Sequence, residues 1–561
     1  MPEQLFIVIL VCLGILVYTA IASRRRAEAR LRSRVRESFG SRERRKYSDA
    51  DLERISYEFR TYGTEGFFLD DITWNDLQMD EVFGLADRTF SGVGESALYR
   101  ILRTPSMDPA EIAERNRLIR FFIENDAQRE KLWLSYAHIG KPRESVFKLV
   151  DNLAELENYS VWQDLLCLAA IAASIVLAVL NPSGMAILPI FAVVGSIIVY
   201  YRRKARIEPF LACVRAAVHM VRSAQEIASS GIPELETYTG ELKKNAAPLR
   251  TLPAKASLLG NDGTVAGGLD AMLMDYLRML THMDLIAFSS LLSQVRAHTG
   301  ELRRLMEVLG YLEAMVSAAS FRAGLPQTAE PDIAPEGERA FDAEGLYHPF
   351  LPEGVTNDIC ADRCVLITGS NASGKSTFLK ATALAAILAQ SIGAAPASRF
   401  RTSLWHVYSS MALRDDIAAR ESYFVVEIRS LRRILDAMDA GEPVLAFVDE
   451  VLRGTNTVER IAASTEILRH IAGGSGLCFA ATHDVELTRL LEEQFTNVHF
   501  TEKVTEDAVI FPYKLLPGPA QSRNAIRLLS VMGYDESITR ASEEAAQHFL
   551  ATGRWEKEGT P

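Results

Sequence analysis

Residues 364–377 read CVLITGSNASGKST, and this stretch decides the fold of the second half of the chain. The residues from Cys364 to Thr368 have the apolar character of a buried strand. The loop from Gly369 to Thr377 fits the pattern G-x-x-x-x-G-K-[ST], and the helical pattern FLKATALAAILAQSIG follows it. Strand, glycine-rich loop and helix in this order bind phosphates, because backbone N–H groups and the helix N-terminus point at them. We therefore predict an α/β domain of the P-loop type.

The loop itself predicts the contacts to a nucleotide. Lys375 is expected to neutralise β- and γ-phosphate oxygens, and Ser376 to hold Mg²⁺. A chance match to the bare pattern is the alternative, and the flanking strand and helix make it negligible. The residues expected to bind the cofactor ATP are Gly369, Ser370, Asn371, Ala372, Ser373, Gly374, Lys375, Ser376 and Thr377.

Two further apolar strands predict the catalytic side chains. Residues 443–450, PVLAFVDE, end in Asp449 and Glu450. Asp449 at the strand tip is suited to the magnesium shell, and Glu450 to orienting or deprotonating the attacking water. The strand at 478–482 is followed by His483, which we expect to sense the γ-phosphate; the alternative for a lone histidine is a structural role.

In this order and spacing, the motifs resemble the ATPase domain of the MutS family of DNA mismatch repair proteins. The likeness runs from about Gly345 to Gln547 and includes TGSNASGKSTFLKA, VDEVLRGTNT and ATHDVEL. It implies an α/β P-loop ATPase of the ABC type that uses ATP and Mg²⁺. On this basis the catalytic residues are Glu450, His483 and Lys375, and the metal ligands are Ser376 and Asp449.

The resemblance also implies a base pocket and a contact across a homodimer. Val355, in VTND, falls where the family packs on the adenine, and Tyr513 falls where an aromatic residue completes the pocket. Residues 414–427 occupy the place of the family's signature segment, which reaches across the dimer to the partner's nucleotide. Ser422 is expected to make that contact, although the two residues before it are Arg-Glu where the family has Gly-Arg.

Outside this domain the sequence predicts amphipathic helices. Residues 47–160 and 203–330 alternate charged and apolar positions with a helical period, which favours an all-α lever or core domain. Residues 69–122 resemble, more weakly, the start of the MutS core. No segment resembles the family's mismatch-reading domain, and residues 234–275 are at most a shortened remnant of its DNA clamp.

Two apolar regions predict transmembrane helices. Residues 5–22 form an uninterrupted apolar run, followed at once by the basic run 24–46, which we expect to be a solvated, lipid-facing segment on the cytoplasmic side. A cleaved signal peptide is the alternative, but the leader carries no Lys or Arg. Residues 161–202 form two apolar arms around Asn181–Gly184, typical of a membrane hairpin. The alternative for that hairpin is a buried pair of helices in a soluble core.

Length and composition agree with a multidomain intracellular chain. At 561 residues we expect several structural units, and six scattered cysteines do not form a disulfide framework. A net charge of −11 excludes a dedicated nucleic-acid coat protein. The expected domains are a transmembrane helix (1–23), a basic segment (24–46), core helices (47–160), a membrane hairpin (161–202), core or lever helices (203–330), the ATPase domain (331–550) and a tail (551–561).

The sequence favours a multi-pass membrane protein with a cytoplasmic ATPase domain. ATP-driven closure of a homodimer would be transmitted through the helices to mismatched or branched DNA. The alternatives are a membrane-associated ATPase acting on a membrane protein partner, a transporter-like ATPase without a DNA role, and a nucleotide-dependent scaffold without turnover.

Overall fold

A computed structural model describes most of the chain, in two compact units. The described residues are 18–19, 22–23, 25–63, 66–155, 160–256, 259, 269–370, 373–411, 423–453, 455–504, 509–520 and 525–555. The helical unit comprises Met1–Gly63, Phe83–Arg100 and Arg117–Gly324, and the sheet unit comprises Thr64–Val82, Ile101–Asn116 and Leu325–Pro561. The transmembrane helix expected at residues 5–22 lies almost wholly outside the described residues.

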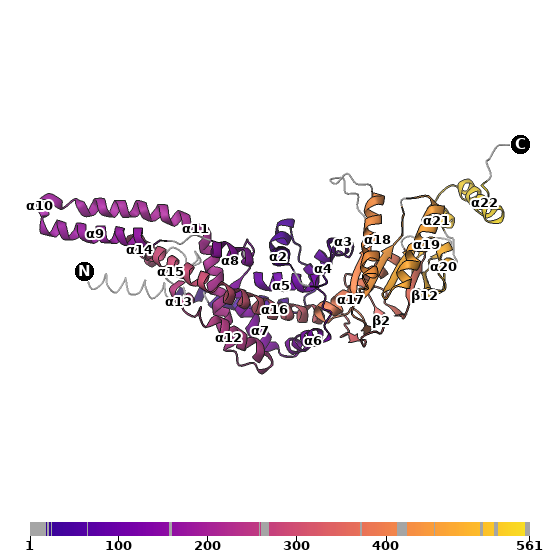
Figure 1. Ribbon diagram of the computed structural model, residues 1–561, viewed down its shortest axis with the longest axis horizontal. Helices are drawn as coiled ribbons and strands as arrows, with labels where there is room; N and C mark the ends of the chain where they lie inside the picture. Colours follow the sequence, from indigo (N-terminus) through magenta and orange to yellow (C-terminus); the bar gives the residue numbers. More distant parts are fainter. Residues whose placement is uncertain are drawn as a thin grey trace. The chain divides into compact units, whose positions relative to one another are not determined.

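The helical unit contains long helices and no strands among its described residues (Figure 1). Three helices cross the boundaries of the units: α4 (Met79–Ala86), α5 (Gly92–Arg103) and α6 (Pro109–Glu124). The remaining elements of the helical unit are α2 (Asp49–Tyr62), α7 (Asp126–Ile139), α8 (Val146–Glu155), α9 (Trp162–Leu180), α10 (Pro182–Met185), α11 (Leu188–Ala228), η1 (Pro233–Leu235), α12 (Glu236–Ala246), α13 (Leu252–Ala256), α14 (Leu269–Thr281), α15 (Met283–Ala297) and α16 (Thr299–Gly324).

Helix α16 provides much of the core of this unit, because most of its residues are buried. It also carries a buried carboxylate, Glu313, which accepts hydrogen bonds from the backbone N–H groups of Phe90 (2.6 Å) and Ser91 (3.2 Å). Tyr311 of α16 stacks on Tyr238 of α12 with ring centroids 5.7 Å apart. Helix α12, which lies in the stretch considered as a clamp remnant, therefore packs as part of the helical core.

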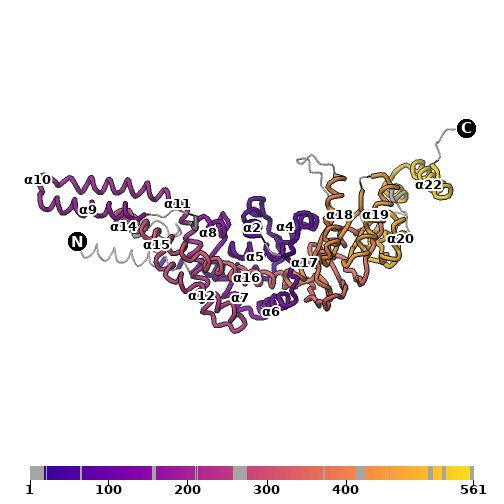
Figure 2. The backbone as a smooth tube through the Cα atoms, in the orientation of Figure 1, coloured from indigo at the N-terminus to yellow at the C-terminus, as the bar shows by residue number. Residues whose placement is uncertain are grey.

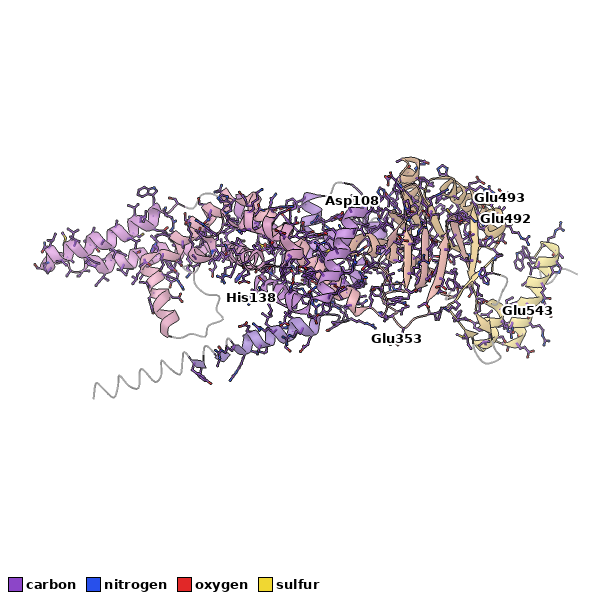
Figure 3. All side chains as sticks on the ribbon, turned by 90° about the horizontal axis from the view of Figure 1, so that it is seen from below. Asp108, His138, Glu353, Glu492, Glu493 and Glu543 are labelled. Carbon is purple, nitrogen blue, oxygen red and sulfur yellow. The ribbon has the colours of Figure 1, made fainter. Side chains whose placement is uncertain are left out.

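The apolar hairpin is an antiparallel pair formed by α9 and the first part of α11 (Figure 2). Among the described residues, α9 is the one helix long and apolar enough to cross a membrane, and only 11% of it is buried. Figure 3 shows side chains projecting outward from both helices of the pair. The alternative, a buried pair of helices in a soluble core, would require most of α9 to be buried, whereas most of it is exposed. Helix α11 continues to Ala228, so the boundary expected at residue 202 falls inside one helix.

Several polar side chains of the hairpin are buried and contact His282 or one another. His282 Nδ1 lies 2.9 Å from Asp164 Oδ1, and His282 Nε2 lies 3.0 Å from Ser196 Oγ. Arg203 Nη2 lies 3.0 Å from Asp164 Oδ2. These four residues, the hairpin polar cluster, are each at most 8% exposed. The cluster joins α9 and α11 to the residue that precedes α15.

The sheet unit is an α/β fold, as predicted. Its strands are β1 (Asp332–Ile333), β2 (Phe341–Leu346), β3 (Asn357–Ala361), β4 (Cys364–Thr368), β5 (Arg399–Thr402), β6 (His406–Ser410), β7 (Val444–Asp449), β8 (Leu477–Thr482), β9 (Phe495–Phe500), β10 (Lys503–Val504), β11 (Val509–Ile510) and β12 (Leu515–Pro517). Its helices are α3 (Asp71–Asp76), α17 (Lys375–Ile392), α18 (Tyr423–Asp439), α19 (Thr457–Gly473), α20 (Glu486–Leu490), α21 (Ala525–Val531) and α22 (Glu536–Thr552).

The main sheet positions the site. Its strand order is β12-β9-β4-β8-β7-β6, and β9, β4, β8, β7 and β6 are parallel, whereas β12 is antiparallel to β9. All five residues of β4 are buried. Because parallel strands end at one edge, the loop after β4, the tip of β7 and the residue after β8 meet there. The second sheet, β1-β5-β2-β3, has four strands.

Two segments expected among the core helices belong to the sheet unit. Asp76, at the end of α3, accepts hydrogen bonds from Ser409 Oγ (2.7 Å) and Met411 N (2.9 Å) beside β6. Arg115 donates to the carbonyl of Ser391 at the end of α17 (2.6 Å). The continuous helical periodicity of residues 47–160 did not distinguish these segments, because their partners lie far away in the sequence.

Candidate nucleotide-binding site

Two glycines shape the loop between β4 and α17. Gly374 has φ 108° and caps the N-terminus of α17 in the left-handed region, which L side chains rarely adopt. Gly369 has φ 147°, and a Cβ there would lie 2.7 Å from the carbonyl oxygen of Phe500. Lys375 Nζ donates to the carbonyls of Gly369 (2.7 Å) and Ser370 (2.9 Å), so the ammonium group lies across the loop.

The loop has the features of an anion cradle. The Ser373 hydroxyl is buried and has no hydrogen-bond partner among the described residues. The N-terminal turn of α17, with Ser376 and Thr377 exposed, presents backbone N–H groups that have no partner within a helix. Burial lowers the pKa of Lys375, which makes a nearby anion favourable. The predicted Asn371 and Ala372 lie outside the described residues.

Ser376 and Asp449, the two predicted metal ligands, lie within hydrogen-bond distance of each other. Ser376 Oγ donates to Asp449 Oδ2 at 2.5 Å. Burial raises the pKa of Asp449, an effect that a bound cation would reverse. A hydroxyl and a carboxylate oxygen suit Mg²⁺, which takes few protein ligands and completes its shell with phosphate and water. Within the described ranges there is no group of three or more His, Cys, Asp or Glu residues that could hold a metal ion.

Glu450 and His483 lie together at the same edge. His483 Nδ1 lies 3.2 Å from Glu450 Oε1, and Arg453 Nε lies 3.0 Å from Glu450 Oε2. The hydrogen bond from His483 lowers the pKa of Glu450, and the same bond raises the pKa of His483. The Glu450 carboxylate is therefore ionised and held by two cation-forming groups. Its backbone has φ 56° and its N–H donates to the carbonyl of Ala481 (2.9 Å).

Glu427 of α18 holds the loop that follows Glu450. It is buried, and its Oε1 accepts the N–H groups of Leu452 and of Arg453, the latter at 3.4 Å. Leu452 also has a positive φ of 56°. Glu427 is thus directed into its own domain, although it belongs to the segment expected at a dimer partner. Ser422, the residue expected to contact the partner's nucleotide, lies outside the described residues.

A cavity of about 950 Å³ beside the loop matches a base pocket. Its lining includes the predicted Val355 and Tyr513 together with Gly374, Lys375 and Ser376. Tyr513 is fixed near the loop, since a Cβ on Gly374 would lie 3.1 Å from its ring. Its carbonyl also accepts a hydrogen bond from the side chain of Asn357 (3.0 Å).

The pocket has an aromatic wall that the sequence interpretation missed. Burial, with a contribution from Lys380, lowers the pKa of His348 to about 4, so this imidazole is neutral at pH 7. The aromatic-rich stretch YHPF at residues 347–350, four residues before VTND, is the signal that identifies part of this wall. Glu353, labelled in Figure 3, also lines the cavity. The aromatic residues of this wall are Tyr347, His348, Phe350, Phe378 and Phe500.

Comparisons with known proteins agree with this geometry. Residues 365–550 match the family model described as MutS domain V. DNA mismatch repair protein MutS of Thermus thermophilus is 30% identical over 277 residues, which cover 48% of this chain and 33% of that protein. The corresponding protein of Natronomonas pharaonis is 32% identical over 267 residues, covering 46% and 31%. MutS of Thermus aquaticus is 33% identical over 209 residues, covering 36% and 26%.

The matching part of the chain spans between about a quarter and a third of the length of these relatives. The resemblance expected for the ATPase domain is confirmed for residues 365–550, which match MutS domain V and make up most of the sheet unit.

Proposed function

We propose that the sheet unit binds and hydrolyses ATP. The observation that carries this proposal is the assembly of the Lys375 loop, the Ser376–Asp449 pair and Glu450 at one sheet edge, beside an aromatic cavity of about 950 Å³. The match of residues 365–550 to MutS domain V supports the same activity.

Different residues of the chain bind the phosphates, the adenine and Mg²⁺, and another positions the attacking water. The loop N–H groups and Lys375 hold the phosphates, and the cavity with Tyr513 and Val355 holds the adenine. Ser376 and Asp449 would hold Mg²⁺, which when bound neutralises phosphate charge. Glu450 accepts the proton of, or orients, the attacking water, since its ionised carboxylate can act as a base.

His483 and Arg453 position Glu450 for this task. Each lies within about a hydrogen-bond length of a different carboxylate oxygen, at 3.2 and 3.0 Å. These contacts hold the carboxylate of Glu450 in one orientation. A movement of His483 in response to the γ-phosphate would therefore also move Glu450. A side chain held in this way supports turnover rather than passive nucleotide binding.

DNA is the ligand that we propose for the helical part, with ATP-driven closure of a homodimer as the means of gripping it. The relatives are named DNA mismatch repair proteins, which supports mismatched DNA as the ligand, with branched DNA as the second candidate. Closure would be favoured by ATP and released by hydrolysis.

ATP turnover by the detergent-solubilised chain tests this proposal. We expect turnover that is stimulated by mismatched or branched DNA more than by homoduplex, with the stimulation falling as salt rises. Glu450→Gln should bind ATP but lose turnover. Parental turnover in Glu450→Gln would contradict the catalytic role, and turnover indifferent to all DNAs would leave an ATPase that acts on a protein partner.

We also propose that the chain is a multi-pass membrane protein with its ATPase domain in the cytoplasm. The low burial of α9 and the inward-facing hairpin polar cluster support this, because lipid-facing hairpins expose apolar side chains and bury polar ones. The expected anchor at residues 5–22 would add one span. Resistance of the full chain to alkaline carbonate extraction tests the location, and release into the soluble fraction would contradict it.

A further inference from the structure

A strongly basic cavity of about 1030 Å³ opens in the helical unit. Its walls come from the helical residues 25–38, the segment 43–47, α2, the start of α5 and the stretch 137–143 at the end of α7. Seven lysines and arginines line it, against three acidic residues. None of these residues belongs to the nucleotide site.

The inner cations of the cavity are already compensated. Arg45 lies 2.7 Å and Lys141 lies 3.0 Å from the carboxylate of Asp87, which is completely buried. Lys141 and Arg54 pair with the buried Glu95 at 2.8 and 2.7 Å. These ion pairs fix the floor and walls, and they leave little net charge there for a ligand.

Three outer cations are different. Arg34, Lys46 and Arg143 line the same cavity, are exposed, and have no ion-pair partner in the part of the chain that the structure describes. Like charges around one cavity repel one another, so an anion shared among them is stabilised. Arginine and lysine together suit a phosphate group, which accepts several charge-assisted hydrogen bonds.

The end of the basic segment, residues 39–46, is held against the helical core beside this cavity. The Arg88 guanidinium donates to the carbonyls of Ser41 (2.7 Å) and Glu43 (2.6 Å), and the N–H of Gly40 donates to Ser320 Oγ (2.9 Å). Residues 39–46 are therefore held against the helical core, which differs from the solvated run expected from the sequence. Lys46 is consequently part of a shaped site rather than of a free basic tail.

We propose that this cavity binds a phosphate group, carried either by an anionic lipid headgroup or by a small phosphorylated molecule. The lining begins at Leu31, close in sequence to the apolar run that ends at residue 22, where a membrane surface would supply anionic headgroups. The site does not depend on ATP binding, so its failure and that of the proposed ATPase are separable.

Calorimetric titration of the full chain in neutral detergent tests the site. The probes are dioctanoyl phosphatidylglycerol, dioctanoyl phosphatidylcholine and glycerol 1-phosphate. We expect phosphatidylglycerol to bind at least tenfold more tightly than phosphatidylcholine. Two triple variants each remove three positive charges from exposed positions, and the helix content of each, measured by circular dichroism, reports folding of the helical unit. The cavity triple is Arg34→Gln, Lys46→Gln and Arg143→Gln, and the control triple is Arg26→Gln, Arg30→Gln and Arg32→Gln.

The cavity triple should lose at least tenfold in affinity for phosphatidylglycerol, and the control triple should keep it. Binding of glycerol 1-phosphate as tight as that of the lipid would identify a free phosphate ligand, whereas binding of the lipid alone would identify a headgroup; both support the site. Equal losses in the two triples would overturn it in favour of general electrostatic attraction. Absence of binding, or displacement of the lipid by duplex DNA at equal concentration, would also overturn it.

Discussion

Helices α17 and α9 are similar in length and both largely apolar, although α9 is the more apolar of the two, and they are opposite in burial. Helix α17 has 18 residues and buries 15 of them, leaving Ser376, Thr377 and Lys380 less covered. Helix α9 has 19 residues and buries two, which are the polar Asp164 and Ser174. An apolar run therefore indicates that a helix is kept away from water. It does not indicate whether protein or lipid covers the helix. For α17 the covering is protein, and for α9 we propose lipid.

The largest expected effect is at the first residue of α17. Lys375→Ala should abolish nucleotide binding, because it removes the ammonium group that lies across the loop and that we propose to hold the phosphates. Binding of a fluorescent ATP analogue measures this. Lys380→Ala, in the same helix but outside the cavity lining, serves as the control. Retained binding in Lys375→Ala would contradict the phosphate assignment.

Truncation of matched leucines should sharpen the contrast in burial. Leu384→Ala, at a fully buried position of α17, should lower the free energy of unfolding by about 2–5 kcal/mol. Leu180→Ala, which is 75% exposed at the end of α9, should change it by less than about 0.5 kcal/mol. Urea titration in detergent, followed by loss of ATP binding and by helix content, measures both. Similar effects would mean that protein covers α9.

A charge placed on α9 should distinguish lipid from water as its surroundings. Ile175→Arg, at a position that is half exposed, should hinder membrane insertion by about 2.5–3.5 kcal/mol if the residue faces the bilayer centre. Val458→Arg, on an exposed position of α19, is the matched control and should leave the membrane fraction unchanged. Fractionation of expressing cells compares the two. An unchanged distribution for Ile175→Arg would count against a spanning hairpin.

The smallest effect concerns pH. Because the pKa of His483 is raised, its contribution to stability is present below its unfolded pKa of about 6.5 and is lost as pH rises through the raised value. Because the pKa of Glu450 is lowered, its contribution is present above about 4.5 and is lost as pH falls through the lowered value. His483→Ala should therefore flatten the stability profile above pH 6.5. An unchanged profile in thermal unfolding would show that the pair does not titrate there.

The sequence predicted the parts of the site that are local in the chain. The strand before the loop, the helix after it, and the tips that carry Asp449 and His483 each follow from a short pattern, and the parallel sheet brings them together. The pairing of Asp76 with Ser409 and the aromatic wall around His348 depend on contacts between distant segments. The positive φ of Glu450 could not be predicted from the sequence either, because nothing in VDE requires it.

Glu427 connects helix α18 to the loop that follows Glu450. Its helix begins at Tyr423, inside the segment 414–427 that is expected to reach a dimer partner, and its carboxylate accepts a hydrogen bond from the backbone two residues beyond Glu450. Two left-handed residues, Glu450 and Leu452, store about 1–3 kcal/mol each in that short stretch. In the proposed dimer, a shift of this helix would let the stored strain relax and misalign the water-orienting carboxylate. Each subunit would then time its hydrolysis by the state of the other.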